Sequence, residues 1–288
     1  MIDNLTDVLA DPVDGTALTL DAPGGPLRSA AGRTFDIAGT GYAVLTPAGL
    51  DESLGDSEDM VTARETFLSR GHFAPFVEAV TASVVQALDD ADVPDDQQVT
   101  ILDAGAGTGF YLSHTLDQVE QARGVGIDVS TDAANLLAQA HPRVGALVAD
   151  LAGRLPVRDA SVDVITSVFA PVNFPEFARA LPVGGRLIVL TPAPGHLDEL
   201  RAPLGIDLVD AAQAEEIRQA AGRFFAEVGQ PRDIVFPMTL DQESIANQVA
   251  MSPSARAINP DELHERLDRL ADQMTITAHG LLLTLRRR

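Results

Sequence analysis

A glycine-rich turn between a buried strand and a helix constrains this chain more than any other feature. The apolar run Val99–Leu102 leads into the sequence D-A-G-A-G-T-G at residues 103–109, and a helical pattern follows at about 110–122. Glycines at alternate positions suit a turn that visits positive φ and that a ligand approaches closely. The dinucleotide fingerprint G-x-G-x-x-G would need its third glycine at position 110, where Phe110 stands. The turn therefore predicts a ligand site at the end of a strand, but not a dinucleotide site.

Beyond the turn, short strand-like runs rich in β-branched residues alternate with helical patterns. The runs are Val99–Leu102, Gly124–Ile127, Gly145–Val148, Val162–Val168 and Arg186–Leu190, and the helical patterns lie at about 110–122, 131–140 and 173–181. This alternation is typical of an α/β fold with a mainly parallel, doubly wound sheet. Helices at about 210–227 and 260–272, with strands near Ile234–Thr239 and Met274–Leu285, are expected to complete a seven-stranded sheet that ends in a hairpin.

Two acidic residues follow the next two strands. Asp128 ends the second run nineteen residues beyond Gly109, and Asp150 follows the third run. A carboxylate at the end of the second strand can accept hydrogen bonds from both ribose hydroxyls of a nucleoside, and Asp150 would lie near its adenine. A glycine turn by itself is often only a turn, but the three features together are typical of S-adenosylmethionine (SAM) methyltransferases. The sequence therefore predicts SAM binding.

The first 55 residues differ in character from the rest of the chain. Residues 1–55 are punctuated by turn residues, and extended pieces such as Ala17–Leu20 and Thr34–Ile37 suggest two small hairpins. Helical patterns begin after this region, with Ser57 as the first helix start. We therefore expect a small β-rich module over 1–55, which leans on a main domain over 56–288.

The charge composition excludes several kinds of chemistry. The chain has 20 basic residues, all of them Arg, against 42 acidic ones, so its net charge is −22; it has no Cys and no Lys. A thiolate nucleophile, a cysteine-bound zinc, a lysine Schiff base and a P-loop lysine are therefore excluded. A large electrostatic grip on nucleic acid is also disfavoured, which leaves a local arginine patch as the means of contacting RNA. Codon usage in a GC-rich genome and adaptation to salt both fit this composition.

No apolar run approaches the roughly 18 residues that a membrane span needs. The N-terminus has neither a basic segment nor an apolar signal-peptide core. The sequence predicts a cytoplasmic protein without a membrane partner.

Further motifs identify a family. They are Thr34–Ala38 with Gly41-Tyr42, then Gly55–Pro75, Leu102–Tyr111, Gly126–Ser130, Phe169–Pro171 and Thr191–Leu200. Across most of residues 10–200 the chain resembles the large-subunit ribosomal RNA guanine-N1 methyltransferases of the RlmA/RrmA type, some of whose members confer macrolide resistance. The segments Gly55–Pro75 and Thr191–Leu200 go beyond what a generic SAM-binding fold requires.

The resemblance implies a Rossmann-like class I methyltransferase that uses SAM to methylate N1 of a guanine in ribosomal RNA. In the family, the residues here at Phe73, Gly107, Thr108 and His196 contact SAM. With the residues of the glycine turn and the two acids, the expected SAM site comprises Phe73, Asp103, Gly105, Gly107, Thr108, Gly109, Asp128, Asp150 and His196. A surface histidine that caps a helix is the alternative interpretation of His196.

The family also opens with a zinc ribbon, and this chain departs from it. The pattern C-x-x-C, followed by a cysteine and a histidine, falls here on Asp11, Asp14, Ser29 and Arg33. Zinc in closed structural sites prefers Cys and His, and an arginine cannot coordinate it. We therefore expect a degenerate, metal-free module that keeps its hairpins.

Contacts to the RNA substrate are expected from Arg28, Arg33 and Arg64, and Phe169 is placed to stack on a flipped base. An ion pair with Asp56 or Asp59 is an equal alternative for Arg64, and a core position is the alternative for Phe169. The sequence assigns no general base, so the catalytic residues stay unknown. Two other functions remain open, methylation of a small molecule and a non-catalytic role as a SAM-binding relative. The oligomeric state is open as well, with a homodimer among the alternatives.

Overall fold

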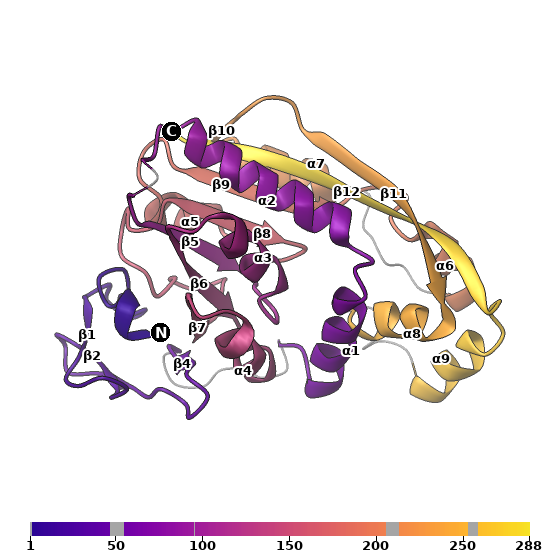
Figure 1. Cartoon of the computed structure of the whole chain (residues 1–288), viewed down its shortest axis with the longest axis horizontal. Helices are drawn as coiled ribbons and strands as arrows, with labels where there is room; N and C mark the ends of the chain where they lie inside the picture. Colours follow the sequence, from indigo (N-terminus) through magenta and orange to yellow (C-terminus); the bar gives the residue numbers. More distant parts are fainter. Residues whose placement is uncertain (1, 47–54, 95, 206–212, 253–258) are drawn as a thin grey trace.

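The computed structural model describes residues 2–46, 55–94, 96–205, 213–252 and 259–288 (Figure 1). Its centre is a sheet of five parallel strands in the order β7–β6–β5–β8–β9. The strands are β5 (Val99–Ala104), β6 (Ala122–Asp128), β7 (Val144–Val148), β8 (Val164–Val168) and β9 (Arg186–Pro192). The strand order reverses between β5 and β8, where open α/β sheets bind ligands at their carboxyl ends. This confirms the expected Rossmann-like α/β fold with a mainly parallel sheet.

The sheet is larger than the seven strands expected, and the difference lies at its two edges. The antiparallel strand β12 (Gln273–Arg287) follows β9, and it pairs with both β11 (Arg232–Asp241) and β10 (Phe225–Glu227). At the other edge, β4 (Ala43–Val44) pairs in parallel with β7. The described part of the sheet therefore has nine strands. With 15 residues, β12 is long enough to pair with different strands along its length. With two residues, β4 is too short to leave a recognisable pattern in the sequence.

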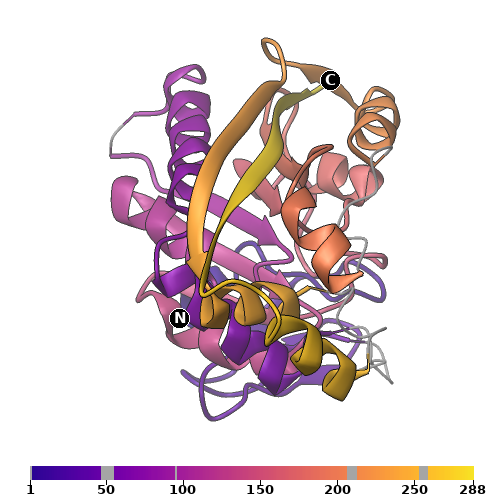
Figure 2. The same ribbon diagram turned by 90° about the vertical axis from the view of Figure 1, so that its right-hand side faces the viewer.

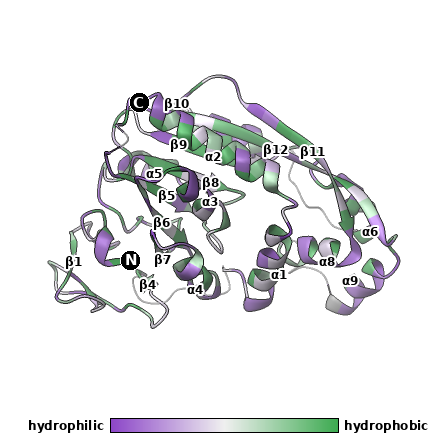
Figure 3. Cartoon of the chain, viewed as in Figure 1, coloured by the Kyte–Doolittle hydropathy of each residue, from purple (hydrophilic) through white to green (hydrophobic). Residues whose placement is uncertain are grey.

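Helices cover both faces of the sheet. One apolar cluster lies beneath α2 (Ala74–Asp89), α3 (Phe110–Gln118) and α4 (Thr131–Ala140), and α2 follows β9 and β12 along its length (Figure 1). The second cluster lies beneath α5 (Phe174–Ala180) and α7 (Gln213–Ala221). Hydrophobic residues concentrate on the central strands and on α2, whereas α9 (Pro260–Leu267) is mostly hydrophilic (Figure 3). No helix in the described ranges is long and apolar enough to cross a membrane.

The first long helix begins where its capping residue predicts. Ser57 caps α1 (Glu58–Ser69), and its side chain accepts a hydrogen bond from Met60 N at 3.5 Å. Three expected helices end too late. The helices expected at 110–122 and 260–272 stop at Gln118 and Leu267, and the one expected at 210–227 stops before Gly222, after which β10 follows. Residues 210–212 lie outside the described residues.

Two short helices were not expected from the sequence. They are α6 (Asp198–Leu204) and α8 (Gln242–Ala250), and the latter is capped by Asp241, whose side chain accepts from Ser244 N at 2.7 Å. Helices α8 and α9 fall between β11 and β12, and they lie beside α1 at the end of the long hairpin (Figure 2).

The N-terminal module forms a small antiparallel sheet of β1 (Leu18–Leu20), β2 (Leu27–Ser29) and β3 (Thr34–Phe35). A short 3₁₀ helix, η1 (Ile2–Leu5), precedes it. Apolar residues of the module pack into the same cluster as residues of β6 and β7, so the module leans on the main sheet as expected. The domain division at residue 55 stays a prediction, since β4 from the first 55 residues completes the large sheet.

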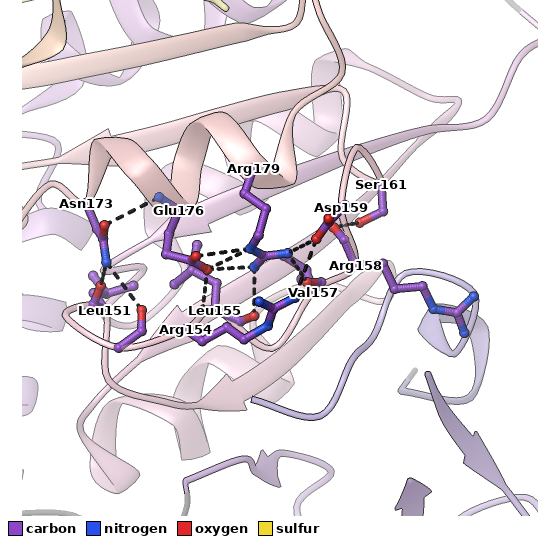
Figure 4. A network of polar contacts seen from close by, with 11 residues as sticks. Leu151, Arg154, Leu155, Val157, Arg158, Asp159, Ser161, Asn173, Glu176 and Arg179 are labelled. Atoms are coloured by element: carbon purple, nitrogen blue, oxygen red, sulfur yellow. Dashed lines mark hydrogen bonds and ion pairs between the residues drawn. The ribbon is translucent and has the colours of Figure 1, made fainter. Parts of the chain in front are cut away.

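A polar network fixes the segment that leaves β7 (Figure 4). Arg179 on α5 donates to Leu155 O at 3.0 Å and to Val157 O at 2.8 Å, and Glu176 accepts from Leu155 N at 2.9 Å. The next residue, Arg158, donates to Thr6 O at 2.6 Å. The network therefore joins α5, this segment and the N-terminal module.

Candidate functional site

The glycine turn between β5 and α3 has the backbone that its sequence predicts. Gly105, Gly107 and Gly109 have φ of 80°, 54° and 83°. A Cβ on Gly105 would overlap the Cβ of Ala170, and a Cβ on Gly109 would lie 2.6 Å from a Leu137 methyl carbon. Each of these positions therefore requires glycine for its conformation, and the outer two require it for space as well.

Asp128 ends β6 directly beside this turn. Its Oδ2 accepts from Gly107 N at 2.8 Å, and its Oδ1 accepts from Ser130 N at 2.9 Å. Burial raises the pKa of Asp128, while the two backbone N–H donors lower it. The carboxylate is thereby held in one orientation, with lone pairs left over for the hydroxyls of a ligand.

Asp103 is buried beneath the turn at 2% exposure. It accepts a hydrogen bond from the hydroxyl of Thr166 at 2.7 Å. Burial raises the pKa of Asp103 to about 7, and the nearby charge of Asp128 raises it further against the opposing effect of the Thr166 hydrogen bond. Asp103 therefore changes its charge near neutral pH.

Several buried hydroxyl groups near the carboxyl ends of the strands have no hydrogen-bond partner among the described residues. They are Thr108 Oγ1, Tyr111 OH, Ser167 Oγ and Thr191 Oγ1. Burying a polar group without a partner costs free energy, so such groups point to a polar ligand or water. Thr108 and Tyr111 stand at the turn itself, and with Asp128 their hydroxyl groups suit a nucleoside with an amino-acid tail, as SAM is. Sequence reasoning missed Tyr111, although an aromatic residue with a polar tip in the first turn of α3 was a usable signal.

Four rings gather beside the turn. Phe169 stacks on His196 at 5.9 Å between centroids and 27° between planes, and Phe73 and Phe76 lie against both of them. Phe169 has φ of +51°, a conformation that is strained in a residue other than glycine. Phe169 therefore packs among core rings, as its alternative interpretation held, and its stacking on a flipped base stays a prediction.

His196 is 7% exposed, so it is not a surface residue. Its Nδ1 accepts from the backbone N–H of His279 at 3.0 Å. Burial lowers the pKa of His196 to about 4. The imidazole is therefore neutral at physiological pH, and its single proton is on Nε2.

The three arginines expected to form one RNA-binding patch lie in different surroundings. Arg28 pairs with Asp21 at 2.5 Å on the N-terminal sheet, and both side chains are at least half exposed. Arg64 pairs with Asp56, as the alternative interpretation held.

Asp150, the acid expected near the adenine, is exposed. Its side chain accepts a hydrogen bond from Ala152 N at 2.8 Å.

The four positions of the family's zinc ligands do converge, around a guanidinium group. Arg33 Nε donates to Asp11 Oδ2 at 2.6 Å, and Arg33 Nη2 pairs with Asp14. The backbone N–H of Arg33 donates to Ser29 Oγ at 3.2 Å. In the described ranges no group of three or more metal-ligating side chains occurs, and the metal-free module stays a prediction. We call Asp11, Asp14, Ser29 and Arg33 the N-terminal ion cluster.

Comparisons with known proteins agree with this geometry. A family model described as a methyltransferase domain matches residues 101–188. A Micromonospora griseorubida protein, provisionally named 23S rRNA (guanine-N(1)-)-methyltransferase, is 40% identical over 264 residues, which are 89% of each chain. The 23S rRNA (guanine(748)-N(1))-methyltransferase of Streptomyces fradiae is 38% identical over 246 residues, 85% of each chain. The solved structure of a SAM dependent methyltransferase from Aquifex aeolicus has 15% identity and a TM-score of 0.41, over 67% of this chain and 86% of that one.

Proposed function

The chain belongs to the family of 23S rRNA (guanine-N1)-methyltransferases, and from that premise we propose that it transfers a methyl group from SAM to N1 of a guanine in large-subunit ribosomal RNA. The observation that carries this proposal is the juxtaposition of the glycine turn, Asp128 and the stacked pair Phe169–His196. The first two form a nucleoside site, and the pair offers a flat aromatic surface beside it.

SAM is the cofactor, and when bound it supplies the methyl group on a sulfonium. We propose that Asp128 accepts from the ribose hydroxyls and that Asp150 lies toward the adenine. The backbone of the turn and Thr108 would line the rest of the molecule, with Asp103 beneath it. Phe73 and His196 would contact it from the aromatic side. Unpaired Thr108 Oγ1 and the positive φ angles of the turn support this arrangement.

Phe169 is the proposed stacking surface for the guanine. Its strained backbone and its stacking on His196 support a functional role over a purely structural one. Because Nδ1 of His196 already accepts a hydrogen bond, its Nε2 donates and does not abstract a proton. The proton on N1 of guanine therefore leaves to another acceptor or to water, and the chain contributes mainly alignment and a dry pocket.

RNA contacts by Arg28 and Arg33 remain part of the proposal. Both arginines are paired with acids in the N-terminal sheet, so a phosphate must compete with those carboxylates. Binding should accordingly weaken steeply with salt, and each lost phosphate contact should lower the log–log slope by roughly one unit. Ribosomal RNA as substrate implies action in the cytoplasm. A homodimer stays a prediction, which sedimentation velocity would measure.

The proposal is tested in two measurements. In titration calorimetry, Asp128→Ala should weaken SAM binding by about 1–3 kcal/mol, because buried hydroxyl donors lose their acceptor. Mass mapping of ribosomal RNA should show a guanine N1 methylation that the wild-type chain restores to a deletion strain. Phe169→Ala should fail to restore it while it retains SAM affinity.

Two results would contradict the proposal. Wild-type SAM affinity in Asp128→Ala would remove the cofactor assignment. Failure of the wild-type chain to modify ribosomal RNA in any assembly state would favour methylation of a small molecule, which the net charge of −22 also suits.

A further inference from the structure

Arg64 lies against the glycine turn rather than on an open surface. It belongs to α1, and its side chain is 27% exposed. A Cβ built on Gly107 would be 3.4 Å from Arg64 Cδ and 3.8 Å from its Nε. The guanidinium therefore lies close to the middle glycine of the turn, on the side where a side chain at position 107 would stand.

The guanidinium is held from two directions. Its Nε donates to Asp56 Oδ2 at 3.2 Å, and Nη2 donates to the same oxygen and to Met251 O at 3.1 Å. Asp56 is itself fixed, because its carbonyl accepts from Ser130 Oγ at 2.6 Å. The arginine is thus anchored to α8 on one side and to the turn that follows Asp128 on the other.

One edge of the guanidinium remains unused. Among the residues that the structure describes, Nη1 of Arg64 makes no hydrogen bond, whereas Nε and Nη2 are engaged. Within the described ranges, the buried phenol oxygen of Tyr111 also has no hydrogen-bond partner. Burial raises the pKa of Tyr111, and the positive charge of Arg64 opposes that rise, so the two groups interact electrostatically.

SAM carries one carboxylate, at the end of its amino-acid tail. The glycine turn and Asp103 cannot provide a cationic partner for it, and Gly107 N already donates to Asp128. A guanidinium pairs with a carboxylate through its planar array of donors and stays charged at every physiological pH. A partly occupied guanidinium beside the turn is the partner that this carboxylate requires.

We propose that Arg64 binds the carboxylate of SAM through its free Nη1 edge, with Tyr111 OH as a second donor. Asp56 and Met251 O are positioning groups that hold the guanidinium in place. This assignment rests on the proposed function, because it presupposes SAM in the crevice. It also moves Arg64 from the expected RNA contacts to the cofactor site.

The test compares SAM with decarboxylated SAM, which keeps the sulfonium and the amine and lacks the carboxylate. In titration calorimetry with the full chain, the wild type should bind SAM about ten- to a hundredfold more tightly than the decarboxylated ligand. Arg64→Gln should bind the two ligands about equally, at the affinity that the wild type has for decarboxylated SAM. Arg64→Lys should fall between, because it keeps the charge without the planar fork.

Arg70→Gln is the matched control. Arg70 is the C-cap of the same helix, six residues beyond Arg64, and it pairs with Glu243 of α8. It should keep the wild-type preference for SAM, and circular dichroism should show that all variants remain folded. A retained preference in Arg64→Gln overturns the assignment, and so does an equal loss for both ligands, which would mean a structural role. Binding of neither ligand by the wild type overturns the proposed function itself.

Discussion

Two arginines of this chain lie among acids, and the difference between them separates a structural cluster from a ligand site. Arg33 is shared by two carboxylates in the N-terminal ion cluster, and the Asp11 side chain there is fully buried. Arg64 is held by one carboxylate and one neutral carbonyl beside the glycine turn. In the first case two carboxylates already compensate the positive charge, so an RNA phosphate must displace one of them to bind Arg33. In the second, the group retains the capacity to bind an anion.

The largest effect is expected from returning zinc ligands to the N-terminal ion cluster. Wild-type protein should contain no tightly held zinc, and Asp11→Cys/Asp14→Cys/Ser29→Cys/Arg33→His should bind about one ion per chain. Structural zinc sites contribute about 10–16 kcal/mol of apparent binding free energy. Elemental analysis measures the content, and a chelator should lower the melting temperature of the variant alone. Arg33→His by itself is the control, and zinc in the wild type would contradict the view that a guanidinium has replaced the metal.

Two glycines with nearly the same φ allow the glycine turn and the N-terminal module to be compared for the cost of adding a side chain. Gly105 and Gly32 have φ of 80° and 83°, but a Cβ on Gly105 overlaps Ala170 whereas one on Gly32 meets nothing within 4 Å. Gly32→Ala should cost about 1 kcal/mol of unfolding free energy, from backbone strain alone. Gly105→Ala should cost about 2–5 kcal/mol, because overlap adds to strain, and it should abolish SAM binding. Urea unfolding and calorimetry measure both, and equal costs would show that the turn has room to relax.

A smaller effect on stability is expected at Asp103, the buried carboxylate that accepts a hydrogen bond from the Thr166 hydroxyl. Burial raises the pKa of Asp103 to about 7 in the folded protein, above its value of 3.8 in the unfolded chain. The native state therefore binds more protons between about pH 4 and 7, and the stability that this group contributes is lost as pH rises through that window. Asp103→Asn should gain on the order of 1–4 kcal/mol over the wild type between pH 4 and pH 8.

Urea unfolding at a series of pH values measures this difference between the two proteins. Asp150→Asn, which removes an exposed carboxylate, controls for the loss of one negative charge. A difference in unfolding free energy that stays constant across the pH range would contradict the prediction. It would mean that folding does not raise the pKa of Asp103.

Features written in adjacent residues were predictable from the sequence. The glycine turn, Asp128 at the end of its strand and the Ser57 cap all depend on a few neighbouring positions. The family resemblance singled out His196, but not the rings that surround it.

Features that depend on distant residues were not predictable. The contact of Arg64 with Met251 O joins residues 187 positions apart, and nothing in either local sequence indicates it. Helix α8, which provides that carbonyl, was itself missed because its nine residues fall between two long strands. The free phenol of Tyr111 likewise follows from tertiary packing, since an unpaired atom is defined by what surrounds it.

The hairpin of β11 and β12 sets where α8 lies, and with it the Met251 carbonyl that holds Arg64. Ten residue pairs separate its open end from the residue where α8 begins, and the side chains of each strand alternate between faces. A change of one residue in β11 would turn its buried side chains outward, but a matched change of two in each strand would keep the facing and move α8 by about 7 Å. The strand pair therefore permits changes of length only in steps of two residues, and each such step would carry the Met251 carbonyl away from Arg64.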